Sequence, residues 1–186
     1  MTQRELRFRF FSEIVTSIGW PQIQYSMVGH NLGLFGDHKM SSQVLAESLE
    51  ISQRLGDRDT MAWTIFSLSC VALYRREFKN VQTLCRKALL LFSKMEDRFG
   101  AIRTLEKLAI AVTFGRNQEE RATHLFGALE NLRSEIGWQV PLTEKALYEE
   151  SVTATRNALG DLAFDKAWRA GRTMTLERAI LYALES

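Results

Sequence analysis

A period of forty residues runs through the middle of this sequence and limits the possible folds more than any other feature. The stretch 57–97 holds two runs whose apolar residues stand three and four positions apart, and the polar break 75–77 separates them. That spacing places the apolar side chains on one face of a helix, and so short a break predicts two antiparallel helices in contact. A shift of forty residues places Asp57 on Asp97 and Ile65 on Leu105. The recurrence therefore predicts a stack of similar helix pairs.

The rest of the chain also indicates an all-α fold. Only two prolines are present, Pro21 and Pro141, and no clear alternating run of the kind that predicts a strand stands between turn signals. We expect an α-solenoid of antiparallel helix pairs that forms one domain. Its expected parts are an N-terminal helix over 3–20, repeats over 22–57, 58–97 and 98–137, and C-terminal capping helices over 142–186, all within a single domain 1–186.

Glycine-containing breaks indicate where the individual helices end. Thr143 is the expected cap of a helix that begins at Glu144, because its hydroxyl can accept a free first-turn N–H. Gly171 is expected to stop the helix before it, and Thr175 resembles the cap of the last helix. The expected helices outside the central pair are Gln22–Phe35, Lys39–Leu55, Phe99–Phe114, Gln118–Ile136, Glu144–Leu159, Leu162–Ala170 and Leu176–Leu184.

The charge balance and the cysteines limit the possible partners and compartment. With 24 basic and 22 acidic residues, the net charge of +2 is too small to predict nucleic acid as a directly bound partner. No apolar run reaches the roughly 18 residues of a membrane span. Cys70 and Cys85 lie on facing helices, so a disulfide is conceivable, but no signal peptide indicates an oxidising compartment. We therefore expect a cytoplasmic protein with reduced thiols.

The sequence contains none of the motifs that carry catalysis or hold a metal ion. No strand precedes Gly29, Gly33 and Gly36, and no G-K-[ST] follows them, so a phosphate-binding loop is not indicated. Neither H-E-x-x-H nor C-x-x-C occurs. The adjacent carboxylates Glu119 and Glu120 point about 100° apart on a helix and do not converge on one substrate. We therefore expect no enzymatic activity, no cofactor and no metal site.

The first helix of each pair should line the concave side of the stack. Its residues outside the core stripe should then point into a groove, and this set is unusually apolar. The pattern favours a protein or peptide partner, such as an apolar peptide or a partner helix. The alternative is that the C-terminal helices fold into the groove and cover it. The candidate binding residues are His30, Trp63, Phe66, Cys70, Leu73, Arg103, Glu106 and Ile110.

The N-terminal helix over 3–20 carries a wider apolar stripe than a single neighbour needs. A helix at the end of a linear stack has one neighbour, so part of this stripe is free to pair with a second copy. The stripe could equally take the place of repeats missing upstream. The candidate residues of a homodimer interface are Phe8, Phe11 and Val15.

The helix pairs resemble tetratricopeptide repeats, in which small residues lie midway along both helices and a Gly-Asp or Gly-Asn type of turn joins them. Gly29, the turn Gly36-Asp37 and Ser48 match this pattern in one pair. Ser69 and Ala88 match it in the next pair. The resemblance implies a right-handed superhelix of helix pairs.

The C-terminal part is similar to the C-terminal end of large bacterial ATP-binding regulators of the LuxR and MalT-like kind. The run A-L-G-D-L-A-F-D-K-A-W-R-A-G at 158–171 carries this similarity, and the linker L-G-D-R at 55–58 resembles those that join the repeats of bacterial signalling proteins. In such regulators a nucleotide-switch ATPase precedes a repeat domain that senses an inducer or a partner. This chain shows no phosphate-binding loop and no DNA-binding helix-turn-helix, so the resemblance implies the repeat part alone, either as a fragment or as a stand-alone product that starts at Met1.

These observations favour a non-catalytic protein-interaction and regulatory module. The resemblance implies the sensor or scaffold part of a bacterial signalling or transcription-regulator system. Two alternatives stay open, namely a self-assembling structural module and a domain that binds a small inducer in the concave groove.

Overall fold

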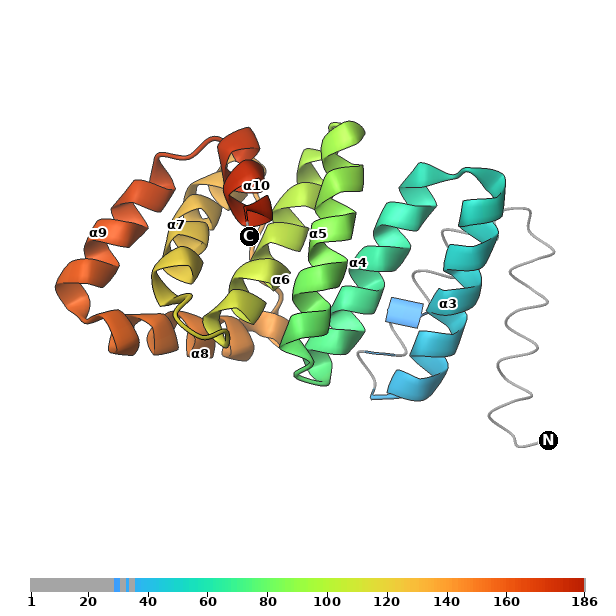
Figure 1. Cartoon of the computed structure of the whole chain (residues 1–186), viewed down its shortest axis with the longest axis horizontal. Helices are drawn as coiled ribbons and strands as arrows, with labels where there is room; N and C mark the ends of the chain where they lie inside the picture. The colour runs from blue at the N-terminus through green and yellow to red at the C-terminus, as the bar shows by residue number, and fades with distance from the viewer. Residues whose placement is uncertain (1–28, 31–32, 34–35, 186) are drawn as a thin grey trace.

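A computed structural model describes residues 29–30, 33 and 36–185, and this part of the chain is all-α. The prediction of an all-α fold is thereby confirmed. Eight helices occur within the described residues (Figure 1): α3 (His38–Leu55), α4 (Arg58–Tyr74), α5 (Phe78–Lys94), α6 (Arg98–Thr113), α7 (Glu119–Glu135), α8 (Leu142–Leu159), α9 (Asp161–Arg172) and α10 (Leu176–Leu184).

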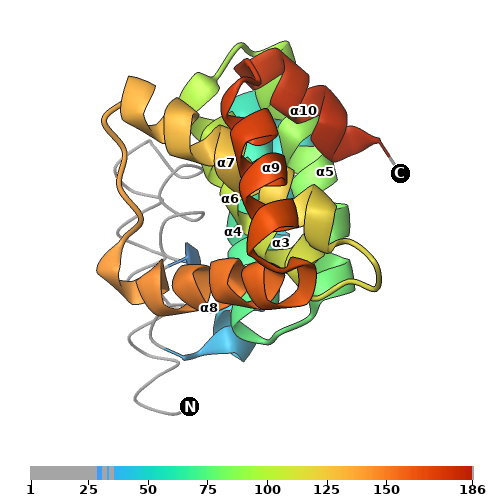
Figure 2. The same cartoon turned by 90° about the vertical axis from the view of Figure 1, so that its left-hand side faces the viewer.

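The helices α3 to α7 stand side by side, and each packs on the next along the chain. The C-terminal helices depart from this order. Helix α8 crosses beneath α6 and α7 and contacts both, α9 returns beside α7, and α10 contacts α5, α6 and α7 (Figures 1 and 2). Neighbouring helices in this row pack against each other, whereas the α-solenoid and its right-handed superhelix stay predictions.

The forty-residue period is visible in the starts of the helices and in their caps. Helices α4 and α6 begin forty residues apart, after Asp57 and Asp97. Both aspartates have φ −76° and ψ 91°, and each carboxylate accepts a hydrogen bond from the backbone N–H three residues later. These bonds satisfy a first-turn N–H that the helix leaves free. The same local sequence thus makes the same helix start in both repeats.

One residue with left-handed backbone occurs in the turn before α3, in each of the four connections from α3 to α7, and in the turn after α7. That conformation suits glycine, because a side chain there meets its own backbone. Three of the positions are occupied by other residues. The six residues are Gly36, Gly56, Arg76, Glu96, Asn117 and Gly137.

Replacement of Glu96 with glycine is expected to raise the free energy of unfolding by about 0.5–1 kcal/mol. Glu96 has φ +57°, and it places a carboxylate at the C-terminal end of α5, where the helix dipole disfavours negative charge. Urea unfolding measures the change. Lys94→Gly, inside the last turn of the same helix, should lower stability by about 1 kcal/mol. An E96G variant no more stable than the parent would contradict the role given to the left-handed backbone.

Helices α4 and α6 are enclosed and form the centre of the core. Their buried residues lie on every side of each helix, as expected for a helix that has neighbours all round. The predicted core stripes of the central pair are confirmed for most members. Leu68, Leu84 and Leu91 of these stripes are half-buried, whereas the following are buried: Ile65, Ser69, Ala72, Val81, Cys85 and Ala88.

Two expectations about the C-terminal helices are wrong, and one is confirmed. Helix α8 begins at Leu142 after Pro141, so Thr143 lies inside the helix and does not cap it. Gly171 does not stop α9, which continues to Arg172, because the glycine lies against α7 where a side chain would not fit. The last helix has the expected bounds, and the Thr175 hydroxyl accepts a hydrogen bond from the Arg178 backbone N–H at 3.3 Å.

Several predicted features lie outside the described residues. They include the N-terminal helix over 3–20 and the dimer candidates Phe8, Phe11 and Val15. Of the predicted helix 22–35, the described residues Gly29, His30 and Gly33 are helical. Among the described helices, none combines the length and the apolar character needed to cross a membrane.

Candidate functional site

The structure buries five of the eight predicted groove residues, so these five do not form an open surface. Their helices, α4 and α6, have neighbours on several sides, and α8 adds a further contact on α6. Coverage by C-terminal helices was the alternative to an open groove, and on α6 the structure agrees with it. His30, Trp63 and Arg103 remain partly exposed. The buried members are Phe66, Cys70, Leu73, Glu106 and Ile110.

Arg103 lies at the centre of a group of aromatic rings at the edge of this buried region. Its guanidinium carbon is 4.8 Å from the ring centroid of Phe66, 4.9 Å from that of Trp138 and 5.8 Å from that of Phe99. Phe99 and Trp138 meet edge to face at 5.2 Å, and Trp63 lies 5.6 Å from Phe66 and 6.1 Å from Phe99. We call these five residues the arginine–aromatic cluster. A cation over aromatic faces is attracted by the ring quadrupoles, so the rings hold the guanidinium in place.

Two members of the cluster were not among the predicted site residues. Phe99 is 40% exposed in the first turn of α6, and Trp138 lies in the linker after α7. The linker turns at Gly137, which has φ +65°, and the Trp138 backbone N–H donates to the Arg133 carbonyl at 2.9 Å. A tryptophan directly after a helix-ending glycine was visible in the sequence, but its approach to α6 depends on tertiary packing.

Three polar atoms around the cluster are buried and have no hydrogen-bond partner among the residues that the structure describes. They are Nδ1 of His30, Nε of Arg103 and Nε1 of Trp138. The His30 ring stacks on Phe66 at 6.3 Å between centroids, so all three residues adjoin the same group of rings. Such atoms are uncommon in folded proteins, and each one requires an explanation.

Beside the cluster lies a buried network of four charged side chains from three helices. Lys107 on α6 donates to its neighbour Glu106 at 3.0 Å and to Glu144 on α8. Arg133 on α7 donates to Glu106 at 3.1 Å and to the Tyr148 hydroxyl at 2.8 Å. Two cations therefore face two carboxylates, and the network balances its own charge. It fastens α8 to α6 and α7.

Lys107 is unsuited to act as a general base. Burial alone would lower the pKa of its ammonium group, but the carboxylates of Glu106 and Glu144 outweigh burial and raise that pKa above its ordinary value. The lysine therefore stays charged and serves as the central donor of the network. Its side chain is 1% exposed.

The two cysteines are unsuited to nucleophilic chemistry as well. Cys70 and Cys85 are free and buried, and burial raises the pKa of each thiol to about 12. A thiolate is the reactive form of cysteine, so these thiols are inert at neutral pH. In the part of the chain that the structure describes, no group of three or more His, Cys, Asp or Glu side chains is arranged to hold a metal ion.

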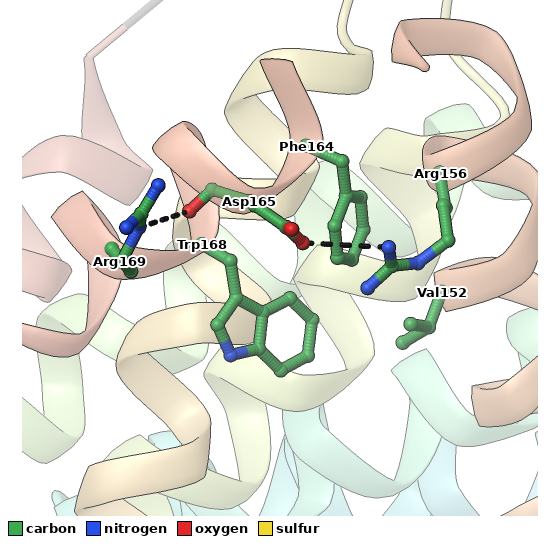
Figure 3. A pocket seen from close by; sticks show the side chains of 6 residues that line it. All are labelled: Val152, Arg156, Phe164, Asp165, Trp168 and Arg169. Carbon is green, nitrogen blue, oxygen red and sulfur yellow. Dashed lines mark hydrogen bonds and ion pairs between the residues drawn. The ribbon is translucent and has the colours of Figure 1, made fainter. Parts of the chain in front are cut away.

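A separate cavity of about 310 Å³ lies between α8 and α9 (Figure 3). Its charged side chains already have partners. Arg156 pairs with Asp165 at 3.4 Å and stands 4.0 Å from the ring centroid of Phe164, while the Trp168 indole N–H donates to Glu130 at 2.5 Å. This cavity therefore offers a ligand fewer free polar groups than the arginine–aromatic cluster does. Its lining residues are Val152, Arg156, Phe164, Asp165, Trp168 and Arg169.

The stability of the fold is expected to fall on acidification because of His30. Burial lowers the pKa of His30, and the charges of Arg103 and Lys107 lower it further. Glu144 acts in the opposite direction and raises this pKa, but its effect is smaller than that of burial. A histidine in the unfolded chain has a pKa near 6.5. Below about that pH the unfolded chain therefore binds a proton at this position more readily than the folded chain does. The free energy of unfolding should then decrease as the pH falls from about 6.5 to the folded-state pKa, below which His30 adds no further pH dependence.

Urea unfolding at a series of pH values between about 7.5 and 5 tests this expectation. The His30→Gln variant should lose part of the pH dependence, because glutamine does not titrate. An unchanged slope in H30Q would show that His30 does not contribute to it.

Comparisons with known proteins place part of this chain beside bacterial regulators. Over 108 residues it is 33% identical to a protein of Mycobacterium bovis named "Putative HTH-type transcriptional regulator" and to two proteins of the same name from Mycobacterium tuberculosis strains CDC 1551 and H37Rv. The matched stretch is 58% of this chain but 12% of each relative. No family model and no solved structure matches. Over half of the chain is thus similar to a short part of much longer proteins named as transcriptional regulators.

Proposed function

We propose that this chain is a non-catalytic interaction and regulatory module, the sensor or scaffold part of a bacterial transcription-regulator system. The similarity to the mycobacterial relatives supports the regulatory role. The row of helix pairs supports the interaction role, because stacked repeats present extended surfaces to partners. The tetratricopeptide-like and MalT-like character and a place in the cytoplasm belong to the same proposal.

The observation that carries the proposal is the partly exposed arginine–aromatic cluster. Tryptophan, tyrosine and arginine are the residues that most often dominate the binding energy of protein interfaces. Here two tryptophans and an arginine stand together with the exposed ring of Phe99. The rigid rings bury apolar area at a small cost in side-chain entropy, which suits them to anchor a partner. A protein partner is therefore the ligand that fits this surface.

Catalysis is a weaker interpretation of the same residues. Burial raises the pKa of the Cys70 and Cys85 thiols to about 12, and the carboxylates of Glu106 and Glu144 keep Lys107 a cation, so these three groups lack a reactive form. We therefore propose that the chain has no enzymatic activity of its own.

Direct contact with DNA is also a weaker interpretation for the described helices. A protein that binds DNA presents unpaired arginines and lysines to the phosphates. Several surface arginines are instead paired with carboxylates. The pairs include Arg76 with Glu150, Arg98 with Glu135 and Arg156 with Asp161.

Site-specific photocrosslinking in the source bacterium tests the proposal. A photoreactive phenylalanine analogue at Phe99 should give a covalent adduct with one defined protein. The same analogue at Leu90, which is 49% exposed on α5, serves as the control. Adduct formation at Phe99 that falls when Trp138 is replaced by alanine supports the proposal. An absence of adduct at Phe99, or equal adduct at Leu90, would argue against this surface as the binding site.

A further inference from the structure

Arg103 is a cation without a carboxylate partner within the described residues. Of the acidic groups around it, Glu106 and Glu144 face Lys107 and Arg133 in the buried network. The carboxylate of Asp59 is hydrogen-bonded to Trp63 of the cluster and not to Arg103. Glu135 pairs with Arg98. The network is neutral as a unit, so the guanidinium of Arg103 adds an uncompensated positive charge beside it. A charge held among aromatic rings is screened less by solvent than one on an open surface.

The unpartnered polar atoms next to this charge form a set of donors. The Nε–H of Arg103 and the Nε1–H of Trp138 can only donate a hydrogen bond, and Nδ1 of His30 donates in one of its two tautomers. A ligand that satisfies them must therefore supply acceptor oxygens. Burial of such donors without an acceptor is unfavourable, so an arriving acceptor gains more here than on the open surface.

The geometry points to an acidic segment of a partner protein as the occupant of the arginine–aromatic cluster. We propose that an aspartate or glutamate of the partner binds Arg103, with an adjoining apolar side chain on Phe99 and Trp138. A carboxylate fits better than a phosphate group, because a phosphate carries more charge and Lys107 and Arg133 are not free to balance it. This inference rests on the proposed function and names the chemistry of the partner.

A pair of capped pentapeptides provides the probe. One has the sequence Gly-Phe-Asp-Phe-Gly, and the other has asparagine in place of aspartate, so that the two differ in charge but hardly in shape. The indole N–H signals of the intact chain in ¹H–¹⁵N NMR spectra report binding, and Trp138→Phe assigns the signal of Trp138. The aspartate peptide should shift that signal and bind about tenfold more tightly than the asparagine peptide.

Two further measurements isolate the charge interaction. Arg103→Met keeps the aliphatic stem and should bind the two peptides equally, with the fold checked by circular dichroism. In the unmodified chain, added salt should weaken binding of the aspartate peptide and leave the asparagine peptide unchanged. The salt series tests the charge interaction even if the R103M variant does not fold.

The proposal is overturned if both peptides bind equally, or if neither shifts the Trp138 signal at concentrations up to about 20 mM. Binding of phenylacetate when the aspartate peptide is inert would also overturn it, since the carboxylate would then come from a small molecule. Crosslinking at Phe99 together with equal binding of the peptides would refute only the acidic chemistry. If the crosslink at Phe99 and the preference for the aspartate peptide are both absent, the proposed function is refuted as well.

Discussion

Replacement of Lys107 with methionine is expected to lower the free energy of unfolding by about 3–5 kcal/mol. The side chain is 1% exposed and is the only donor to Glu144 among the described residues. Methionine has a similar length but no charge, so the change would leave Glu106 paired with Arg133 alone and Glu144 without a cation partner among the described residues. An unpaired buried charge is far more costly than the net gain from forming the pair. Urea unfolding followed by circular dichroism measures the change.

Two further variants test whether buried charge is the cause. Adding Glu144→Leu to the Lys107→Met variant restores the charge balance, so the double variant should be more stable than the single one. Lys145→Met is the matched control on the surface of α8, where Lys145 and Glu149 form an exposed pair at 3.7 Å. That control should change stability by less than about 1 kcal/mol. A K107M variant as stable as K145M would show that the network is dispensable.

Replacement of Gly127 with alanine is expected to lower the free energy of unfolding by about 2–3 kcal/mol. An added Cβ would lie 2.2 Å from the backbone oxygen of Trp168, so α7 and α9 would have to move apart. Gly171 has the reciprocal position, because its Cβ would lie 2.1 Å from the backbone oxygen of His124. Backbone atoms cannot rotate away as a side chain can, so the strain spreads along both helices.

The direction of the stability change in G127A tests the packing of α7 against α9. Inside a helix, alanine is normally more favourable than glycine by about 1 kcal/mol. Without the close approach of α9, the substitution would therefore stabilise the protein. A thermal midpoint above that of the parent would contradict the observed packing of α7 against α9.

Much of the fold was predictable because its signals are local. The helix starts after Asp57 and Asp97 follow from a side chain that caps its own helix, and the apolar spacing predicted which faces of α5 are buried. The incorrect end of α9 has a different origin. Glycine commonly marks the end of a helix, yet Gly171 lies inside α9. Glycine is needed there because α7 approaches too closely for a side chain.

The candidate site was predictable only in part. His30, Trp63 and Arg103 were identified from their helical positions, and the structure brings all three to the rings around Phe66. The sequence could not indicate that Trp138, which follows α7, would stack on an arginine of α6. Contacts between residues so far apart depend on the angle at which whole elements pack.

The sequence by itself determined the repeated helices, their caps and their core stripes, because hydrogen bonds and side-chain periodicity within about twenty residues decide these features. Only the tertiary structure decided which polar residues are buried and which partners they have. Glu106 and Lys107 are neighbours that would suit an exposed helix surface, but both are buried. Arg133 and Glu144 arrive from two other helices and neutralise them, while Arg103, one turn away, lies over the ring of Phe66.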